Sequence, residues 1–358
     1  MTMGEARVFH GRKCAKDRIR VIAHGLGVMG SLGVKMMIEK KGLEIVGAIA
    51  RRKEKTGKDL GKIVGLDREL GVIVSDDAEA VFSNTVADII VDTTTSYTRE
   101  LYPNLIKGLR TGLNCVSIAE EMAYPWLCEP ELAVSIDKLA KKNEVTVLGT
   151  GVNPGFVNDA MPVFLSGIPG RLRKIRTRRV TDLSAFIVSD TITSHYGLGL
   201  TPEEYMKKEE QGVVVGHVGG PECVALIADA LGWEVEIKST KEPLVGSVRR
   251  SISGHIVEPG QVYGSKEVDT GLMNGEEVIV LEQYLGFSFD MKTEGLEAGM
   301  WYWLDGEPIV EVKISGTTGP DEVACVTMAR AINAIPYVLN ARPGLLNVNE
   351  VGMISYLI

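Results

Sequence analysis

Two adjacent carboxylates, Glu120 and Glu121, follow a short apolar run at residues 114–119 that is typical of a β-strand. Ligands of open α/β sheets bind beyond the carboxyl ends of the strands, so a bound substrate is expected beside this pair. Neighbouring side chains on an extended segment point to opposite sides, so one carboxylate should face the cleft and the other solvent or a helix. Burial in a cleft raises the pKa of a carboxyl group and suits it to general-base catalysis. The pair is the predicted catalytic site, and a helix-terminal charge or an ion-pair partner is the alternative role for each residue.

A glycine-rich segment with G-x-G-x-x-G spacing lies between a predicted strand at residues 18–24 and an apolar, helix-like pattern. The first glycine permits a tight turn, the second lets the backbone approach a diphosphate, and the third allows close packing of helix on sheet. The helix N-terminus adds unpaired N–H groups and a positive dipole end. The sequence therefore predicts a dinucleotide-binding loop made of Gly25, Leu26, Gly27, Val28, Met29 and Gly30.

The end of the second predicted strand bears on which dinucleotide is bound. NAD-specific domains place an acidic residue there to hold the ribose 2′-hydroxyl, about 20 residues beyond the glycines. Here the strand ends in Arg51 and Arg52, with no acid. Arginine can pair with a 2′-phosphate through its planar fork of donors. We expect NADP to be accepted, with NAD as a second cofactor, and a solvated basic turn is the alternative interpretation.

Hydroxyl groups follow the predicted strand at residues 87–93. Thr93, Thr94 and Thr95 can supply hydroxyl and backbone donors. Because the carboxyl ends of parallel strands share one edge of a sheet, these residues are expected to face the nicotinamide.

The elements that must position these residues alternate between apolar strands and charged helices up to about residue 150. That pattern predicts an α/β fold, a Rossmann domain with a doubly wound parallel sheet covered by helices on both faces. The later segments are richer in strands and predict a second, α+β domain built on an open mixed or antiparallel sheet. The expected boundaries are 1–155 for the dinucleotide-binding domain and 156–320 for a domain of substrate binding and oligomerisation. The helical tail, 321–358, is expected to pack back on the first domain.

Composition narrows the class of protein. The chain is 45% hydrophobic and 24% charged, as in ordinary globular proteins, and its net charge of −8 argues against nucleic acid or a membrane surface as a partner. The five cysteines are scattered and form no C-x-x-C pair, so neither a disulfide framework nor a zinc site is predicted. No secretory signal and no apolar run of about 18 residues is visible. A cytoplasmic location without a metal is expected.

Five segments together carry a family resemblance over most of the chain. The chain resembles the 2,4-diaminopentanoate dehydrogenases and native amine dehydrogenases of the dihydrodipicolinate reductase-like superfamily. The resemblance implies oxidative deamination of 2,4-diaminopentanoate at C4 to 2-amino-4-oxopentanoate and ammonia. The segments are 24–30, 117–125, 149–156, 216–219 and 333–344.

The resemblance also implies roles for individual residues. Glu120 is expected to activate water, with Glu121 as the second choice, and Asn153 is expected to bond the nicotinamide carboxamide or the substrate. Arg179 and His217 are the candidates for the carboxylate of a diamino acid substrate. His195 and Tyr196 are further candidates for the pocket. A homodimer formed through the open sheet is expected.

Three alternatives remain at this point. Reduction of a cyclic imine, as in dihydrodipicolinate reductase, is usually associated with a His-His-x-x-Lys segment, which this chain lacks. A dehydrogenase acting on another amino acid is barely separated from the main interpretation by sequence. A sensor that binds NADP without catalysis is disfavoured because it would need no general base.

Overall fold

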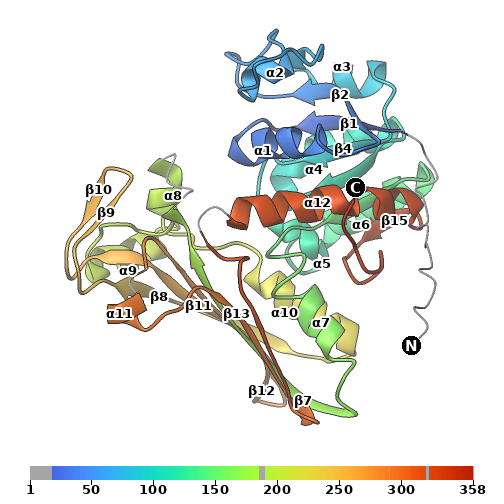
Figure 1. Ribbon diagram of the computed structural model, residues 1–358. Coiled ribbons are helices and arrows are strands. Elements are labelled where there is room, and N and C mark those ends of the chain that lie inside the picture. The colour runs from blue at the N-terminus through green and yellow to red at the C-terminus, as the bar shows by residue number, and fades with distance from the viewer. Residues whose placement is uncertain (1–17, 185–189, 290, 320–321, 358) are drawn as a thin grey trace, which may run out of the picture.

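The structure, a computed structural model, describes residues 18–184, 190–289, 291–319 and 322–357. The polar N-terminal extension, with His10 and Cys14, therefore lies outside the described residues. Seven parallel strands form the first sheet, in the order β15-β6-β5-β4-β1-β2-β3 (Figure 1). Its strands are β1 (Ile19–His24), β2 (Leu43–Ile49), β3 (Val74–Ser75), β4 (Ile89–Asp92), β5 (Asn114–Ser117), β6 (Thr146–Gly149) and β15 (Gly344–Leu346).

Helices cover both faces of this sheet, which explains why β4 and β6 are buried along their whole length. The strand order reverses between β1 and β4, and a doubly wound sheet binds its ligand at that point. The parallel Rossmann sheet predicted from the sequence is confirmed. Its helices are α1 (Val28–Met37), α2 (Leu60–Ile63), α3 (Ala78–Asn84), α4 (Thr98–Arg110), η1 (Glu120–Ala123), α5 (Pro125–Cys128), α6 (Pro130–Lys142) and α12 (Glu322–Asn340).

The C-terminal helix α12 belongs to the core of the Rossmann unit (Figure 1). It is long and apolar enough to cross a membrane by length and composition alone, but Met328, Ile332 and Ile335 are fully buried, and the helix packs against α1, β4, β5 and β6. A Cβ at Gly33 of α1 would collide with Met328, so this glycine allows the two helices to approach closely. The apolar composition of α12 thus reflects its burial inside the protein.

A second, six-stranded sheet has the order β14-β13-β7-β12-β11-β8. The pair β7–β12 is parallel and the other neighbours are antiparallel, so the sheet is mixed. Its strands are β7 (Arg171–Asp182), β8 (Glu236–Val245), β11 (Val262–Met273), β12 (Glu276–Gly286), β13 (Gly299–Glu307) and β14 (Val310–Ile314). The other elements are α7 (Ala160–Leu165), α8 (Asp190–His195), α9 (Pro202–Glu210), α10 (Gly220–Leu231), α11 (Met291–Glu294) and the hairpin β9 (Arg250–Ile252) and β10 (His255–Val257).

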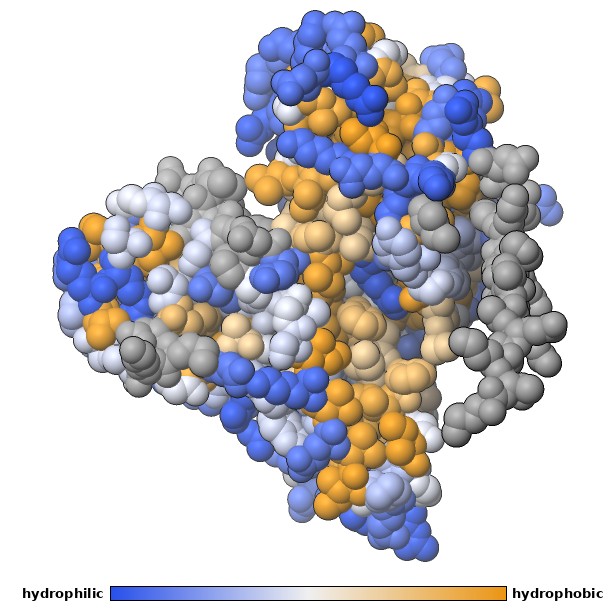
Figure 2. Space-filling model, viewed as in Figure 1, coloured by the Kyte–Doolittle hydropathy of each residue, from blue (hydrophilic) through white to orange (hydrophobic). Residues whose placement is uncertain are grey.

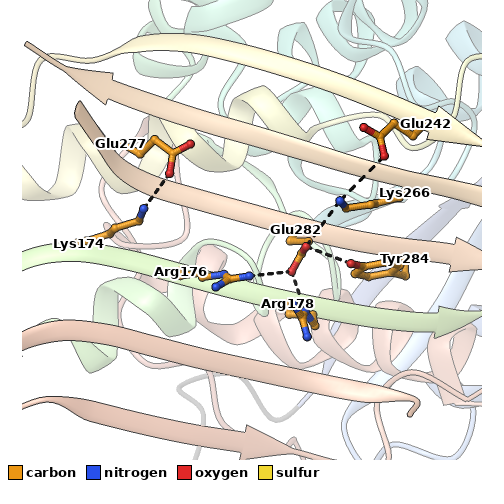
Figure 3. A network of polar contacts seen from close by, with 8 residues as sticks. All are labelled: Lys174, Arg176, Arg178, Glu242, Lys266, Glu277, Glu282 and Tyr284. Atoms are coloured by element: carbon orange, nitrogen blue, oxygen red, sulfur yellow. Dashed lines mark hydrogen bonds and ion pairs between the residues drawn. The ribbon is translucent and has the colours of Figure 1, made fainter. Parts of the chain in front are cut away.

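The two faces of this second sheet differ in character. The inner face packs on α10, where Val224 and Ile227 join a buried apolar cluster with Leu281. The outer face of the central strands carries a charged and aromatic network, centred on Glu282 between Arg176 and Arg178 (Figure 3). In Figure 1, α7 and α10 lie between the sheet and the Rossmann unit, and the opposite face of the described strands is open.

Candidate active site

The glycine-rich loop has the geometry of a diphosphate cradle. Gly25 has φ +93°, and a Cβ there would lie 2.9 Å from the carbonyl carbon of Thr93, so only glycine fits. A Cβ at Gly30 would collide with the carbonyl of Gly25, whereas open space surrounds the same position at Gly27. Helix α1 begins at Val28 with no side-chain cap on its N–H groups. The loop therefore leaves room and free donors where a dinucleotide diphosphate would lie.

A buried contact between a histidine and an aspartate joins the two strand ends beneath this loop. His24 Nδ1 lies 2.6 Å from a carboxylate oxygen of Asp92, at the ends of β1 and β4. The hydroxyl of Thr94 donates to the same carboxylate at 3.0 Å, and the hydroxyl of Thr93 donates to the carbonyl of Gly25 at 3.0 Å. These bonds hold the hydroxyl-bearing segment against the glycine-rich loop.

A pocket of about 380 Å³ opens at this edge, between the Rossmann sheet and the second sheet. Ten of the eighteen residues predicted as a site lie on its wall, whereas Glu121, the two arginines after β2 and five residues of the glycine-rich loop do not. Residues of the second sheet and of the loop before α10 close the side opposite the strand ends. The sequence-predicted residues on the wall are Met29, Thr93, Thr94, Thr95, Glu120, Asn153, Arg179, His195, Tyr196 and His217.

Glu120 is the acidic side chain on the described wall of this pocket. It begins the 3-10 helix η1, because β5 ends at Ser117 and the chain turns before reaching the two carboxylates. Burial raises the pKa of Glu120 to about 7, and a hydrogen bond from the Ser96 hydroxyl partly offsets that effect. A Cβ at Gly219 would lie 3.1 Å from the Cβ of Glu120, so the loop before α10 closes over this carboxylate. Such a group can accept and release a proton near neutral pH.

Glu121 points elsewhere and has a structural partner. One of its carboxylate oxygens accepts a 2.7 Å hydrogen bond from the backbone N–H of Thr98, the first residue of α4. Its own backbone N–H donates to the carbonyl of Ser96 at 3.2 Å. A carboxylate at a helix N-terminus satisfies a free donor and interacts favourably with the helix dipole. The helix-terminal role, one of the alternatives left open by the sequence, describes the position of Glu121.

Arg179 is a buried guanidinium without a charged partner. It is 2% exposed, and no carboxylate of the residues described lies within 4.0 Å of it. Its Nη1 donates to the side-chain carbonyl of Gln283 at 3.4 Å, and its Nε has no hydrogen-bond partner. Burial lowers the pKa of Arg179 to about 10, which still leaves it protonated at neutral pH. A buried, uncompensated cation is costly, so the site favours an anion.

His217 lies beside Arg179 and presents a second buried nitrogen without a hydrogen-bond partner among the described residues. Burial and the neighbouring charge of Arg179 lower the pKa of His217 to about 3, so the imidazole is neutral. Its Nε2 lies 3.5 Å from Nδ2 of Asn153. Nδ1 is buried and has no partner among the described residues. The backbone N–H of His217 donates to Glu267 at 3.1 Å and fixes the loop.

Gln283 is a residue of this site that the sequence analysis missed. Its side-chain carbonyl accepts from Nδ2 of Asn153 at 2.8 Å as well as from Arg179, and it is 1% exposed. The sequence of β12 contained a signal for it, because Gln283 lies between Leu281 and Leu285, two residues from each, and therefore shares their buried face of the strand. A polar residue at a buried position must find partners, and here they are the two residues next to the pocket.

Of the remaining predicted residues, His195 and Tyr196 line the pocket, whereas Arg51 and Arg52 lie outside it. Tyr196 packs edge-on against Phe287, with ring centroids 5.9 Å apart, and burial raises its pKa. The carbonyl of His195 accepts from the N–H of Gly216 at 3.0 Å, which ties α8 to the His217 loop. Arg51 and Arg52 are exposed just beyond β2, away from the pocket, and neither has an ion-pair partner among the residues described.

Comparisons with known proteins identify the family. A family model described as the 2,4-diaminopentanoate dehydrogenase C-terminal domain matches residues 156–358. A model of the dihydrodipicolinate reductase N-terminus matches residues 19–116. The 2,4-diaminopentanoate dehydrogenase of Acetoanaerobium sticklandii is 34% identical over 342 residues, which is 92% of each chain. An amine dehydrogenase of Streptomyces virginiae is 25% identical, over 93% of this chain and 96% of its own. The solved amine dehydrogenase of Mycobacterium smegmatis superposes with a TM-score of 0.82, at 29% identity, over 96% of this chain and 98% of that one.

Proposed function

The chain belongs to the family of 2,4-diaminopentanoate dehydrogenases, and on that premise we propose that it oxidises the C4 amine of 2,4-diaminopentanoate. It is an NAD(P)-dependent amine dehydrogenase. In the proposed reaction, the C4 ammonium form of the substrate, water and NAD(P)⁺ yield 2-amino-4-oxopentanoate, ammonium, NAD(P)H and one proton. The reaction is reversible, so the same site would perform reductive amination.

The observation that carries the choice of substrate is the uncompensated guanidinium of Arg179. With His217 it offers two buried nitrogens, Nε of Arg179 and Nδ1 of the imidazole, that have no hydrogen-bond partner among the described residues, and in this proposal both carry protons and donate to the substrate. A carboxylate matches these donors in charge and in number of acceptor sites. An amino acid is therefore favoured over a simple amine, with Gln283 and Asn153 holding the two donors in place.

Glu120 would handle the protons of the reaction. Its carboxylate accepts a proton from the C4 ammonium and frees the nitrogen lone pair. The nicotinamide, when bound, accepts the hydride from C4. After releasing that proton to solvent, the carboxylate of Glu120 would again be negative, would stabilise the substrate iminium and would remove a proton from the water that attacks C4. Thr93, Thr94 and Thr95 line the pocket at the proposed nicotinamide end, where their hydroxyl oxygens can accept hydrogen bonds, and Asn153 orients the carboxamide or the substrate.

NADP is the cofactor we favour within the nicotinamide class, with NAD also accepted. The support is the absence of an acid at the end of β2 and the presence of two unpaired arginines, Arg51 and Arg52, at that place. We place the enzyme in the cytoplasm, since the four described cysteines are all free, as in a reducing compartment.

A homodimer is part of the same proposal, with the outer face of the second sheet as the interface. That face combines half-buried Trp303 and Tyr284 with arginines stacked at 5.5 to 5.9 Å from their rings. Tryptophan, tyrosine and arginine are the residues enriched at protein interfaces. Arg176 and Arg178 on β7, with Glu277 beside Lys174 and Glu242 beside Lys266, give a second copy charges of both signs to meet (Figure 3).

The test of the proposed function is an assay of cofactor reduction at 340 nm. Purified protein is mixed with 2,4-diaminopentanoate and with either NADP or NAD. Steady reduction, with release of one ammonium per reduced cofactor, supports the proposal. Reduction with 2-aminopentane but not with the diamino acid would exclude the carboxylate site, and binding of NADPH without any turnover would favour a sensor.

A further inference from the structure

The loop after β2 folds back onto the glycine-rich loop through one side chain. Residues 51–58 make two turns, in which the N–H of Lys55 donates to the carbonyl of Arg52 at 3.0 Å and that of Thr56 to Lys53 at 3.2 Å. These turns bring the ammonium of Lys55 to the carbonyl of Leu26, at 2.5 Å. Leu26 stands between the first two glycines, so Lys55 joins the loop that would hold the diphosphate to the end of β2.

The position of this ammonium relative to β2 identifies the part of the cofactor it would meet. The N–H of Gly25 donates to the carbonyl of Ile49, the last residue of β2, at 2.9 Å. The end of β2 is where dinucleotide-binding domains contact the adenosine ribose at its 2′ position. An ammonium at the junction of β2 and the glycine-rich loop therefore lies on the ribose side of the diphosphate site.

Lys55 has donors to spare at this junction. An ammonium carries three N–H donors, and the described contacts use one of them, on Leu26. No carboxylate of the described chain lies within 4.0 Å of Lys55, Arg51 or Arg52. With Lys53 and Glu54 included, residues 51–55 carry four cationic side chains and one anionic one in a protein of net charge −8. So concentrated a positive charge beside a phosphate-binding loop favours a further anionic group.

We propose that Lys55 is a specificity-determining residue that binds the 2′-phosphate of NADP, together with Arg51 and Arg52. The proposal rests on the nicotinamide cofactor of the proposed function and extends it to a residue outside the arginine pair. Because Lys55 is bonded to Leu26, a 2′-phosphate on it would also fix the glycine-rich loop in the conformation that receives the diphosphate.

The experiment measures binding of NADPH and of NADH by cofactor fluorescence on the full chain, without any amine substrate. Lys55→Met removes the ammonium and keeps the length of the side chain. Lys58→Met is the matched control, since Lys58 is exposed in the same loop, and its side chain has no hydrogen bond or ion pair with the described residues. We expect Lys55→Met to weaken NADPH binding about tenfold or more, because it removes a charge-assisted contact, and NADH binding less than about twofold. Lys58→Met should change both affinities less than about twofold.

Three results would overturn the proposal. An equal loss of both cofactors would mean that Lys55 serves the diphosphate or only the loop conformation. If Lys55→Met loses no NADPH affinity, or if Lys58→Met loses as much, Lys55 has no specific role in binding the 2′-phosphate. Competition by 2′-AMP adds a probe with no nicotinamide: it should displace NADPH from the wild type, and about tenfold less well from Lys55→Met. Because none of these measurements needs turnover, they stand or fall independently of the amine substrate.

Discussion

Glu120 and Glu121 are consecutive in the chain, yet their carboxylates serve different parts of the protein. Glu120 lines the pocket, where burial raises its pKa to about 7, and Glu121 accepts the N–H of Thr98 at the start of α4 at 2.7 Å. The chain turns into a 3-10 helix at this point, and successive side chains on such a helix diverge. The pair offers a matched comparison, because the same substitution can be made at both positions.

Glu120→Gln should lower kcat about 10²- to 10⁴-fold, the usual contribution of a general base, while NADPH affinity stays within about twofold. Glu121→Gln should keep most of the activity and lower the free energy of unfolding by about 1 kcal/mol, since it weakens the N-terminal contact of α4. Steady-state kinetics and urea unfolding of both variants make the comparison. Comparable loss of kcat in the two would contradict the separate roles.

The pH dependence follows from the raised pKa of Glu120. The ionised base is needed for amine oxidation, so kcat/KM should rise with pH through about 7. The free energy of unfolding depends on pH in the opposite direction. The pKa of Glu120 is higher in the folded protein than in the unfolded chain, so protonation of Glu120 stabilises the fold. This contribution is fully present below about pH 4.5 and is lost as pH rises through about 7. Glu120→Gln lacks that loss.

Melting temperatures of the wild type and Glu120→Gln at pH 5 and pH 8 test the second effect. The free energy of unfolding of Glu120→Gln, relative to that of the wild type, should be about 1–3 kcal/mol more favourable to folding at pH 8 than at pH 5. Glu267 and Asp269 also have raised pKa values, about 7 and about 6, but they are present in both proteins and cancel in the difference. A constant difference between the two pH values would exclude Glu120 as the titrating group.

Arg179→Met should raise the KM for 2,4-diaminopentanoate about tenfold or more, because it removes a charge-assisted contact to the carboxylate. Turnover of 2-aminopentane, which has no carboxylate, should be unaffected or improved. The variant should also be as stable as the wild type or more stable, since it removes a buried cation that has no anionic partner in the described chain. Equal losses with both amines would indicate a purely structural arginine.

Gln283→Glu tests the same subsite from the opposite direction. The new carboxylate would stand where Gln283 now accepts from Arg179 at 3.4 Å, and it would compete with the substrate carboxylate for the guanidinium. KM should rise about tenfold or more while kcat at saturation changes little. Gln283→Met is the control, because it removes the acceptor without adding a charge. A larger effect on kcat than on KM in Gln283→Glu would argue against the subsite.

Trp303→Glu should convert the proposed dimer to a monomer. Trp303 lies on the outer face of the second sheet, with Arg176 5.5 Å and Arg178 5.9 Å from its ring. Phe164→Glu is the comparison, because Phe164 is an apolar side chain on α7 that is 61% exposed. Figure 2 shows an apolar surface, in orange, below the Rossmann unit. Light scattering reports the mass of each variant. A monomeric wild type, or dissociation only in Phe164→Glu, would exclude the sheet as the interface.

Local patterns in the sequence were sufficient for the Rossmann unit and its cofactor loop. Strand β1, the glycine-rich loop and helix α1 are contiguous, so one short segment contains the whole signal. The strands of the second sheet were harder to predict from the sequence. Strand β8 carries mostly exposed, charged residues, and β11 buries Glu267 and Asp269 at positions where apolar residues would indicate a strand. These carboxylates are buried because Lys241 and backbone donors lie close to them, and contacts between distant segments have no local signature.

By itself, the sequence determined the kinds of chemistry available: a dinucleotide loop, a pair of carboxylates and candidate cations for an anionic substrate. Only the tertiary structure decided which carboxylate faces the pocket and which caps α4, because that depends on a turn after Ser117 rather than on strand alternation. It also brought Gln283 to Arg179 and Asn153, from segments 104 and 130 residues away in the chain. Burial set the protonation of Glu120 and His217 near this cluster, since the loss of water around a charge is a property of the folded protein.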